Sequence, residues 1–175
     1  GKTSLVEQML FMTKGTDRLG KTVDGNTTCD YDAEEIKRQI SISLSFAPVS
    51  YKGVKINVID TPGYLDIVGE VNQALRVAGS AVITVDAKAG VEVGTEHIFG
   101  YAGTKPRAFF VTQLDEEHVN YSHTLEDLAN VFGVSVCPIT LPLIDGDKVV
   151  GYVDLLQNKA VDLKGNDIPI PADVP

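Results

Sequence analysis

Three short stretches of this 175-residue sequence carry residue types suited to nucleotide chemistry. The first, Gly1-Lys2-Thr3, matches the last three positions of the phosphate-binding pattern G-x-x-x-x-G-K-[ST] at the start of a predicted helix. In that pattern, backbone N–H groups and the helix dipole bind phosphate. Lys2 would contact the β- and γ-phosphates, and the Thr3 hydroxyl would bind Mg²⁺. A three-residue match also occurs by accident, so it needs support from the rest of the chain.

The second stretch is Asp60-Thr61-Pro62-Gly63, which follows a predicted strand. A carboxylate at the carboxyl end of such a strand can hold Mg²⁺ through water. Gly63 has no side chain, so its N–H can approach a γ-phosphate. The alternative is an ordinary turn, since Asp, Pro and Gly all favour turns.

The third stretch, Thr112-Gln113-Leu114-Asp115, also follows a predicted strand. A carboxylate fixed at Asp115 could accept two hydrogen bonds from guanine, a pair that adenine cannot offer. The alternative is that Asp115 caps a polar loop. In an open parallel sheet, ligands bind at the carboxyl ends of the strands, where all three stretches would converge. Together they predict a site for GTP or GDP with Mg²⁺.

The elements that must position these residues alternate between apolar runs and helical patterns. Helices are predicted over residues 4–12, 68–78, 96–102 and 125–132, and strands over residues 40–46, 54–60, 81–85, 108–112 and 134–139. This alternation predicts an α/β, three-layer P-loop NTPase fold with a mostly parallel sheet and helices on both faces. The first two strands would add an antiparallel edge. We interpret the chain as a fragment that lacks the fold's first strand, which would precede Gly1.

The pattern changes after Pro142. Turn residues at 145–147 and 165–167 separate short apolar runs, and the alternating prolines of residues 168–171 exclude a helix. We therefore predict a nucleotide-binding domain at residues 1–142, truncated at its N-terminus, and the start of a strand-rich insert at residues 143–175.

The composition excludes several classes of function. A net charge of −9 without a basic cluster argues against a nucleic-acid surface in this segment. No apolar run approaches the ~20 residues of a membrane span. Cys29 and Cys137 are isolated and fit a reduced, cytoplasmic protein. His97, His118 and His123 match no metal-binding spacing.

Beyond these motifs, the sequence resembles elongation factor G, a translational GTPase, over essentially its whole length. Residues 54–63 look like the family's strand and second switch, and residues 27–41 resemble its first switch. Ala89-Gly90-Val91-Glu92, with Thr95-Glu96 after it, matches the loop that follows. The tail is similar to the start of the insert that this factor carries within its GTPase domain.

The resemblance implies a role for each of these residues. Catalysis would depend on Lys2, Gly63 and Tyr64, and Mg²⁺ would be held by Thr3, Ser41 and Asp60. The switch loops would be residues 14–41 and 60–66. The implied GTP contacts are Gly1, Lys2, Thr3, Asp60, Thr61, Pro62, Gly63, Tyr64, Thr112, Gln113, Leu114 and Asp115. Ser41 can also be interpreted as one more outward serine on a strand.

Two positions depart from the family pattern. Tyr64 stands where the family commonly has His, and a phenol can orient water but is a poor base near neutral pH. Some elongation factor G-like paralogues share this Tyr. Thr112-Gln113 replaces the family's Asn-Lys, whose Lys stem packs on guanine. We expect guanine affinity to be weakened by ~1–2 kcal/mol, the scale of one hydrogen bond or packing contact.

These features predict a GTPase that acts on the ribosome, in translocation or in ribosome recycling, and contacts it mainly through domains outside this chain. Other hypotheses remain: a ribosome-associated regulator with weak GTPase activity, a ribosomal protection protein of the tetracycline-resistance type, or a P-loop ATPase of another lineage. Asp115 disfavours the last. No membrane partner is expected.

Overall fold

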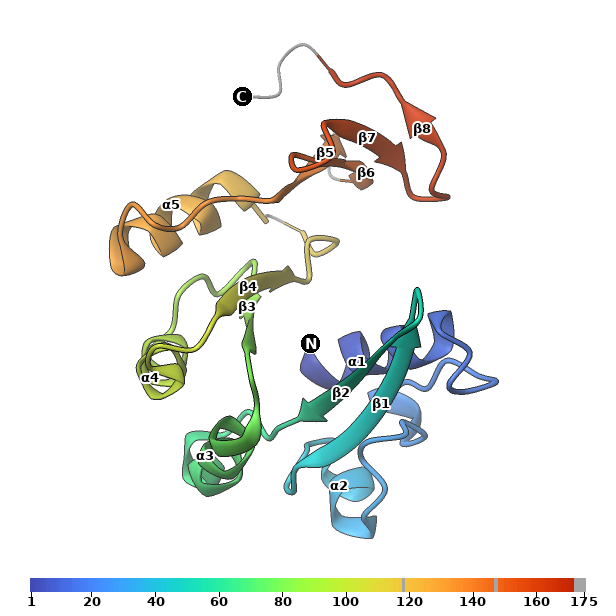
Figure 1. Cartoon of the computed structure of the whole chain (residues 1–175), viewed down its shortest axis with the longest axis vertical. Helices are drawn as coiled ribbons and strands as arrows, with labels where there is room; N and C mark the ends of the chain where they lie inside the picture. Colours follow the sequence, from blue (N-terminus) through green and yellow to red (C-terminus); the bar gives the residue numbers. More distant parts are fainter. Residues whose placement is uncertain (118, 147, 172–175) are drawn as a thin grey trace. The chain divides into compact units, whose positions relative to one another are not determined.

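The structure is a computed structural model that describes residues 1–117, 119–146 and 148–171 (Figure 1). His118, Asp147 in the predicted turn, and residues 172–175 of the predicted insert lie outside these ranges. The chain divides into two compact units, each described by itself below. Unit 1 comprises residues 1–84 and 94–110, and unit 2 comprises residues 85–93 and 111–175.

The described residues form helices and three separate sheets. The helices are α1 (Lys2–Met12), α2 (Ala33–Arg38), α3 (Val68–Val77), α4 (Val93–Ala102) and α5 (Tyr121–Phe132), with short 3-10 helices at Thr22–Asp24 and Leu65–Ile67. The strands are β1 (Ser45–Tyr51), β2 (Val54–Asp60), β3 (Ala81–Asp86), β4 (Arg107–Thr112), β5 (Thr140–Asp145), β6 (Lys148–Asp154), β7 (Lys159–Asp162) and β8 (Asp167–Ile168). The sheets are β1-β2, β3-β4 and β5-β6-β7-β8.

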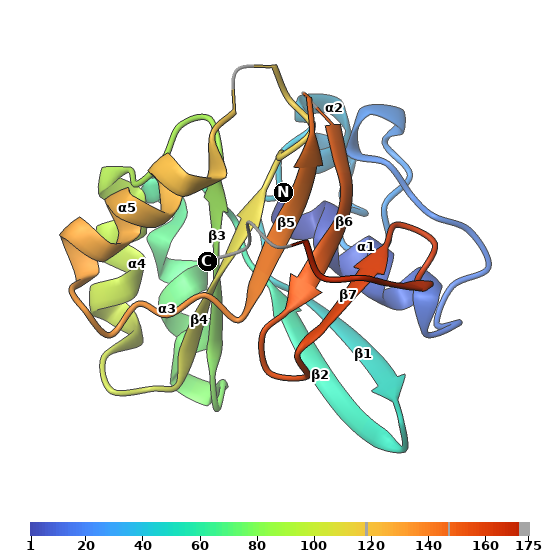
Figure 2. The same cartoon turned by 90° about the horizontal axis from the view of Figure 1, so that it is seen from above.

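Unit 1 is built on the β1–β2 hairpin and the helix packed against it (Figure 1 and Figure 2). The strands are antiparallel, and their register pairs Ser45 with Asp60 at one end and Tyr51 with Val54 at the other. Lys52 and Gly53 both have positive φ at the tip, as tight hairpin turns require. The core under the hairpin contains Val6, Leu10, Cys29, Ala47 and Val49. Burial of this apolar face fixes α1 against the hairpin, chiefly through the β1 residues Ala47 and Val49.

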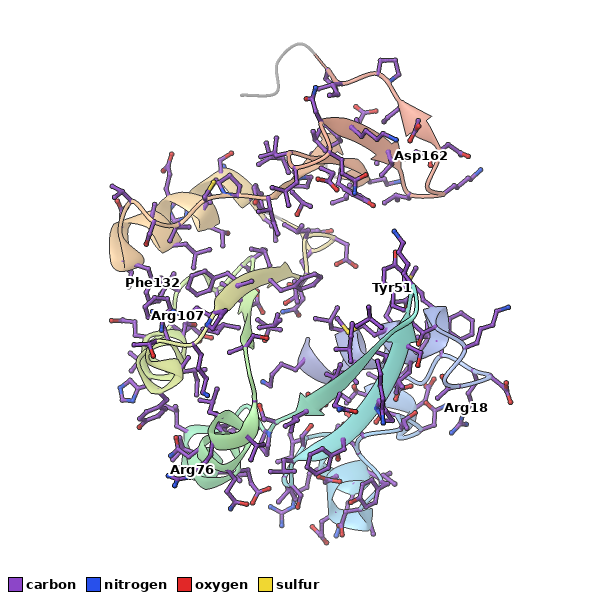
Figure 3. All side chains as sticks on the ribbon, in the orientation of Figure 1. Arg18, Tyr51, Arg76, Arg107, Phe132 and Asp162 are labelled. Atoms are coloured by element: carbon purple, nitrogen blue, oxygen red, sulfur yellow. The ribbon has the colours of Figure 1, made fainter. Side chains whose placement is uncertain are left out.

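The β3–α4–β4 segment follows the predicted parallel arrangement. Ala81 donates its N–H to Pro106 O at 2.9 Å, and Ala87 donates its N–H to Thr112 O at 3.0 Å. Both bonds join residues 25 positions apart, so the two strands run parallel. Arg107 at the start of β4 stacks its guanidinium on the Phe99 ring of α4, 3.7 Å from the ring centroid, and donates to Phe99 O (Figure 3). These contacts fasten the helix to the strand that follows it.

Unit 2 ends in the antiparallel sheet β5-β6-β7-β8. Val153 and Ala160, paired across β6 and β7, are fully buried. Gly151 in β6 allows close strand approach, because a side chain there would collide with Val161 O. The boundary between residues 142 and 143 stays a prediction.

The predicted strand at residues 40–46 is wrong, because the ladder begins only at Ser45. The N–H groups before it bond to side chains instead of a partner strand. Ile42 and Ser43 donate to Glu35 Oε1 at 2.9 and 3.0 Å, and Leu44 donates to Glu70 Oε2 at 2.8 Å. Pro48 lies inside β1, which among the described residues pairs with β2 alone, so its missing N–H interrupts no second ladder.

Other differences have equally local causes. The helix α2 was not predicted, although Asp32 and Glu35 form a reciprocal capping box at its start. The predicted strand at residues 134–139 is wrong: a turn bonds Val136 N–H to Gly133 O at 3.1 Å, and β5 begins at Thr140. The single, mostly parallel sheet is also absent from the described residues, which form mixed α/β architecture with three small sheets.

Candidate functional site

The N-terminus of α1 forms one side of the candidate site. Gly1 is the N-cap and has no side chain to occupy the first N–H groups of the helix, which lack partners within the helix itself. Lys2 follows directly, and a Cβ placed on Gly63 would lie 2.9 Å from Lys2 Nζ. The predicted phosphate-binding lysine therefore touches the predicted γ-phosphate loop. Burial lowers the pKa of Lys2, and the nearby Asp60 carboxylate partly opposes this.

Asp60 is the last residue of β2, and its carboxylate is buried without a hydrogen-bond partner among the described residues. Asp60 as a whole is only 4% exposed. Burial raises the pKa of Asp60, while the Thr3 hydroxyl and the Lys2 ammonium oppose the rise. A buried carboxylate is costly unless it is paired or binds a metal. This unpartnered carboxylate fits the oxygen-rich environment that Mg²⁺ prefers.

Two hydroxyl groups complete the candidate magnesium ligands. Thr3 is 8% exposed, and its Oγ1 lies 3.2 Å from Ser41 Oγ. The Ser41 hydroxyl donates to Asp30 Oδ1 at 2.6 Å. Ser41 therefore does not point outward from a strand, and that interpretation is wrong. Among the described residues no group of three His, Cys, Asp or Glu side chains could hold a metal, so this cluster relies on hydroxyl groups together with a carboxylate.

The remaining residues of the loop after β2 have simple environments. Thr61 is half-buried, Pro62 is buried and Gly63 is exposed. Tyr64 is 57% exposed and begins the short helix Leu65–Ile67. Tyr64 is therefore accessible to solvent.

Two buried carboxylates, Glu7 and Glu35, and the half-buried Glu70 hold the segment between α1 and β1. Glu7 accepts N–H groups of Gly20 and Thr28, Glu35 accepts those of Asp32, Ile42 and Ser43, and Glu70 accepts that of Leu44. The Asp32-x-x-Glu35 spacing matches a capping box and could have predicted part of this arrangement. No comparable signal marked Glu7, since charged residues at helical spacing usually face solvent.

Unit 2 contains the predicted base-reading stretch after β4. Thr112 Oγ1 donates to Val85 O at 3.3 Å. Gln113 has φ +62 and donates its side-chain amide to Asp86 Oδ2, which ties this loop to the end of β3. Leu114 is half-buried, and Asp115 is exposed. Asp115 can therefore accept hydrogen bonds from a ligand. That Asp115 and Lys2 converge on one nucleotide stays a prediction.

The histidines within the described ranges take part in no metal cluster. His97 makes an edge-to-face contact with Tyr101, with ring centroids 6.2 Å apart, and His123 Nδ1 lies 3.4 Å from Asp127 Oδ2 on the surface of α5. Cys29 is buried in the core and Cys137 is exposed. In the part of the chain that the structure covers, no helix has both the length and the apolar character to cross a membrane.

Comparison with known proteins gives consistent results. Residues 1–170 match the family described as Elongation factor Tu GTP binding domain. The chain is 39% identical over 155 residues to the elongation factor G-like protein of Mycobacterium tuberculosis, covering 87% of this chain and 21% of that protein. It is 33% identical over 183 residues to elongation factor G of Granulibacter bethesdensis, covering 99% and 26%.

Two further relatives extend the comparison. The mitochondrial ribosome-releasing factor 2 of Anopheles gambiae is 36% identical over 169 residues, covering 94% of this chain and 23% of that protein. A crystal structure of a protein from Thermus thermophilus superposes with a TM-score of 0.93 at 36% identity, covering 99% of this chain and 27% of that one. The chain thus spans about a fifth to a quarter of the length of these relatives.

Proposed function

Because this chain belongs to the family of elongation factor Tu GTP-binding domains, we propose that it binds GTP with Mg²⁺ and hydrolyses it to GDP and phosphate. The observation that supports this most directly is the buried, unpartnered carboxylate of Asp60 beside Thr3 and Lys2. An ordinary turn would give such a carboxylate hydrogen-bond donors, whereas a cation site leaves its oxygens free to bind the ion.

In the proposed complex, the N–H groups at the start of α1 and the Lys2 ammonium bind the β- and γ-phosphates. Thr3, Ser41 and Asp60 would hold Mg²⁺. When bound, the ion neutralises charge on the phosphate oxygens as the bond breaks. The lowered pKa of Lys2 is set by burial in the free protein, and phosphate oxygens would favour its charged form.

In this proposal, catalysis depends on positioning the γ-phosphate and the attacking water. Gly63 donates its N–H to the γ-phosphate, and the exposed Tyr64 phenol orients a water molecule. The water oxygen attacks the γ-phosphorus, and the bond to the β,γ-bridging oxygen breaks with its electron pair staying on GDP. The protons of the water stay with the inorganic phosphate, which releases one to solvent. Tyr64 does not need to act as a strong base, since phosphoryl transfer depends mainly on the alignment of the water and on stabilisation of the phosphate charge.

The base would be read by Thr112, Gln113, Leu114 and Asp115, with the Asp115 carboxylate accepting the two guanine donors. The exposure of Asp115 supports this. The bond from Gln113 to Asp86 also favours the weaker binding expected where the family's lysine is missing. Binding of fluorescent GTP compared with ATP tests this step. Equal affinity for both nucleotides would favour the alternative of a P-loop ATPase.

We further propose that the three-layer fold has one sheet in which an additional strand joins β2 to β3. An apolar cavity of about 290 Å³ in unit 1 supports this, because it is lined by both strands and by α1 and α3. β2 and β3 each pair on one side only. A strand preceding Gly1 would fill this gap and complete the phosphate loop. The division into a domain at residues 1–142 and an insert from residue 143 is part of the same proposal.

The cellular role that we propose is ribosome-stimulated GTP hydrolysis in translocation or ribosome recycling. Relatives named elongation factor G and ribosome-releasing factor 2 support both roles. The ribosome would be contacted mainly by domains outside this chain, and the cytoplasm is the expected location. The competing hypotheses are a regulator with weak turnover, which Gln113 and Tyr64 favour, and a ribosomal protection protein.

The deciding experiment measures phosphate release from GTP by the full-length protein with and without ribosomes. Ribosome stimulation supports the enzyme, whereas GTP binding without stimulated turnover favours the regulator. Translocation and subunit-splitting assays then separate the two proposed roles. Restored translation in the presence of tetracycline would identify the protection protein.

A further inference from the structure

Glu7 is a fully buried carboxylate that the proposed reaction does not use. It is 1% exposed and lies on α1 one helical turn after Thr3, on the same face. Its Oε2 accepts the Gly20 N–H at 3.0 Å, and its Oε1 accepts the Thr28 N–H. Both carboxylate oxygens therefore bind the backbone of the loop that follows α1. Such bonds are what make burial of a carboxylate tolerable.

The backbone packs closely around this carboxylate at Gly20. A Cβ on Gly20 would lie 2.6 Å from Glu7 Oε2, 2.7 Å from Asn26 O and 2.9 Å from Thr27 Cα. No side chain larger than hydrogen fits without a shift of the backbone. The loop is thus closed onto α1 at two points, and both bonds go to the same side chain.

From this anchor, hydrogen bonds lead to the candidate magnesium ligands. Thr27, next to Thr28, donates its hydroxyl to Asp30 Oδ2 at 3.4 Å. Ser41 donates its hydroxyl to Asp30 Oδ1 at 2.6 Å, and Ser41 Oγ lies 3.2 Å from Thr3 Oγ1. Thr27 and Asp30 are both buried. The contacts form a ring that leaves α1 at Thr3 and returns to it at Glu7.

The direction of these bonds has a chemical consequence. Because Ser41 gives its hydrogen to Asp30, its oxygen accepts the Thr3 hydroxyl and keeps one further lone pair for a cation. If the loop moved away from Glu7, Asp30 would move with Thr27 and Thr28, and the Ser41 hydroxyl would lose its orientation.

We propose that Glu7 is a positioning residue of the magnesium and nucleotide site, acting through Asp30 on Ser41. This inference rests on the proposed function. Glu7 itself contacts backbone N–H groups and not the reacting atoms, so its effect is on the Mg²⁺ dependence of nucleotide binding. A merely structural anchor would alter nucleotide binding equally with and without the ion.

The test uses the full-length protein and the substitution Glu7→Gln. Glutamine keeps the shape but replaces one acceptor oxygen with an NH₂ group that faces a backbone donor. Release of a fluorescent GDP analogue is measured over a series of MgCl₂ concentrations and in EDTA. We expect the MgCl₂ concentration that half-maximally slows release to rise by about tenfold or more, the usual effect of losing an outer-shell partner. Release in EDTA should be unchanged.

Glu126→Gln is the matched control, because Glu126 is an exposed helical residue of α5. It should leave the Mg²⁺ dependence unaltered. In a Ser41→Ala background, Glu7→Gln should add no further effect, since its action passes through Ser41. An additive effect there, or faster release in EDTA as large as that in MgCl₂, overturns the proposal.

Two more outcomes are informative. If thermal unfolding shows that Glu7→Gln does not fold, Asp30→Asn replaces it, because Asp30 is the next link to Ser41. An unchanged Mg²⁺ dependence in a folded Asp30→Asn protein then overturns the proposal. Failure of the unsubstituted protein to bind the GDP analogue would instead contradict the proposed function.

Discussion

The hydroxyl oxygens of Thr3 and Ser41 lie 3.2 Å apart, although 38 positions separate these residues in the sequence. Adjacent ligands of an octahedral Mg²⁺ ion, each at about 2.0–2.1 Å from it, are about 2.9 Å from each other. A hydrogen bond between the two hydroxyls therefore holds their oxygens close to the spacing that a bound ion would require. The start of α1 and the end of the loop before β1 are brought to this spacing by contacts within the protein.

Replacing Ser41 tests this relationship. Ser41→Ala removes one candidate ligand, so we expect the MgCl₂ concentration needed for tight GDP binding to rise at least tenfold. Ser41→Thr keeps the hydroxyl and should remain within about twofold of the unsubstituted protein. The measurement is a titration of fluorescent GDP release with MgCl₂. Ser43→Ala, at an exposed position in the same segment, is the control, and equal effects of the two alanine substitutions would contradict the assignment.

The contact between Gly63 and Lys2 leads to a second prediction. A methyl group at Gly63 would lie 2.9 Å from Lys2 Nζ, and the flexible ammonium would have to move aside. We therefore expect Gly63→Ala to fold normally but to weaken GTP binding more than GDP binding, by about tenfold, since the Lys2 ammonium is displaced from the place beside Gly63 where the γ-phosphate is proposed to bind. Isothermal titration with GDP and a non-hydrolysable GTP analogue measures both affinities.

Gly69→Ala is the control for this experiment. Gly69 lies in α3, where an added methyl group would meet nothing within 4 Å, and alanine is favoured over glycine in a helix by about 1 kcal/mol. This variant should be slightly more stable and bind both nucleotides unchanged. If Gly63→Ala behaves in the same way, Lys2 and Gly63 do not share a phosphate.

Much of the local structure could be predicted from sequence periodicity. The apolar spacing on α3 and the continuous apolar run of β3 indicated a helix and a strand in the correct places. The strand expected at residues 40–46 failed because alternation of apolar and polar residues says nothing of where the N–H groups find acceptors. Glu35 and Glu70, from elements on either side, provide those acceptors.

The candidate site was predictable in part for a similar reason. Lys2, Thr3 and Asp60 belong to short motifs whose chemistry can be deduced from residue type, and the structure gathers them at one end of α1. Glu7 and Asp30 act through tertiary contacts, and a buried carboxylate cannot be told from a solvated one by its position in the sequence. Their burial became apparent only with the fold.

Asp60 leads to a prediction about pH. Burial raises the pKa of Asp60 above its ordinary value of 3.8, so the folded protein binds a proton more tightly than the unfolded chain. Stability is therefore lost as pH rises from about 3.8 through the folded pKa, because the buried carboxylate must ionise. In EDTA at pH 7, Asp60→Asn should raise the melting temperature, and below pH 3.8 the difference should vanish.

With saturating MgCl₂ and GDP at pH 7, the unsubstituted protein should instead have the higher melting temperature, because it alone gains stability from the ion. Thermal unfolding under these three conditions provides the measurement. Asp167→Asn, which removes an exposed carboxylate, should show none of these effects. A melting temperature for Asp60→Asn that is lower than that of the unsubstituted protein in EDTA would show that Asp60 has a structural role.

Gln113 leads to a prediction about affinity. Its side-chain amide bonds to Asp86 across the two loops, and it stands where the resembling family has a lysine. Gln113→Lys can keep a contact with Asp86 through its ammonium and adds a long stem that can pack on the base. We expect guanine nucleotides to bind more tightly by ~1–2 kcal/mol, or about 5- to 30-fold.

Equilibrium binding of fluorescent GDP to the full-length protein checks this gain. Gln157→Lys, at an exposed turn position, adds the same charge elsewhere and should leave the affinity unchanged. Unchanged affinity in Gln113→Lys would refute the assignment of this loop to the base.

Cys29 provides a direct probe of the loop that carries Asp30. Burial, assisted by the carboxylates of Asp60, Glu7, Asp30 and Glu35, raises the pKa of the Cys29 thiol to about 12. Since the ordinary pKa is 9.0, stability from this group is full below pH 9 and is lost as pH rises toward 12. At pH 8 the folded protein should hold Cys29 as a protonated, unreactive thiol. Iodoacetamide should therefore alkylate the exposed Cys137 at least tenfold faster than Cys29.

Because Cys29 lies between Thr28 and Asp30, its alkylation requires the loop to open. We expect MgCl₂ with a GTP analogue to slow Cys29 labelling further, since an ion held by Thr3 and Ser41 stabilises the closed loop through Asp30. Peptide mass spectrometry follows each cysteine separately, and Cys137 in the same sample is the internal control. If Cys29 reacts as fast as Cys137 in the folded protein, the loop is not closed onto α1 in solution, and Glu7 does not hold it there.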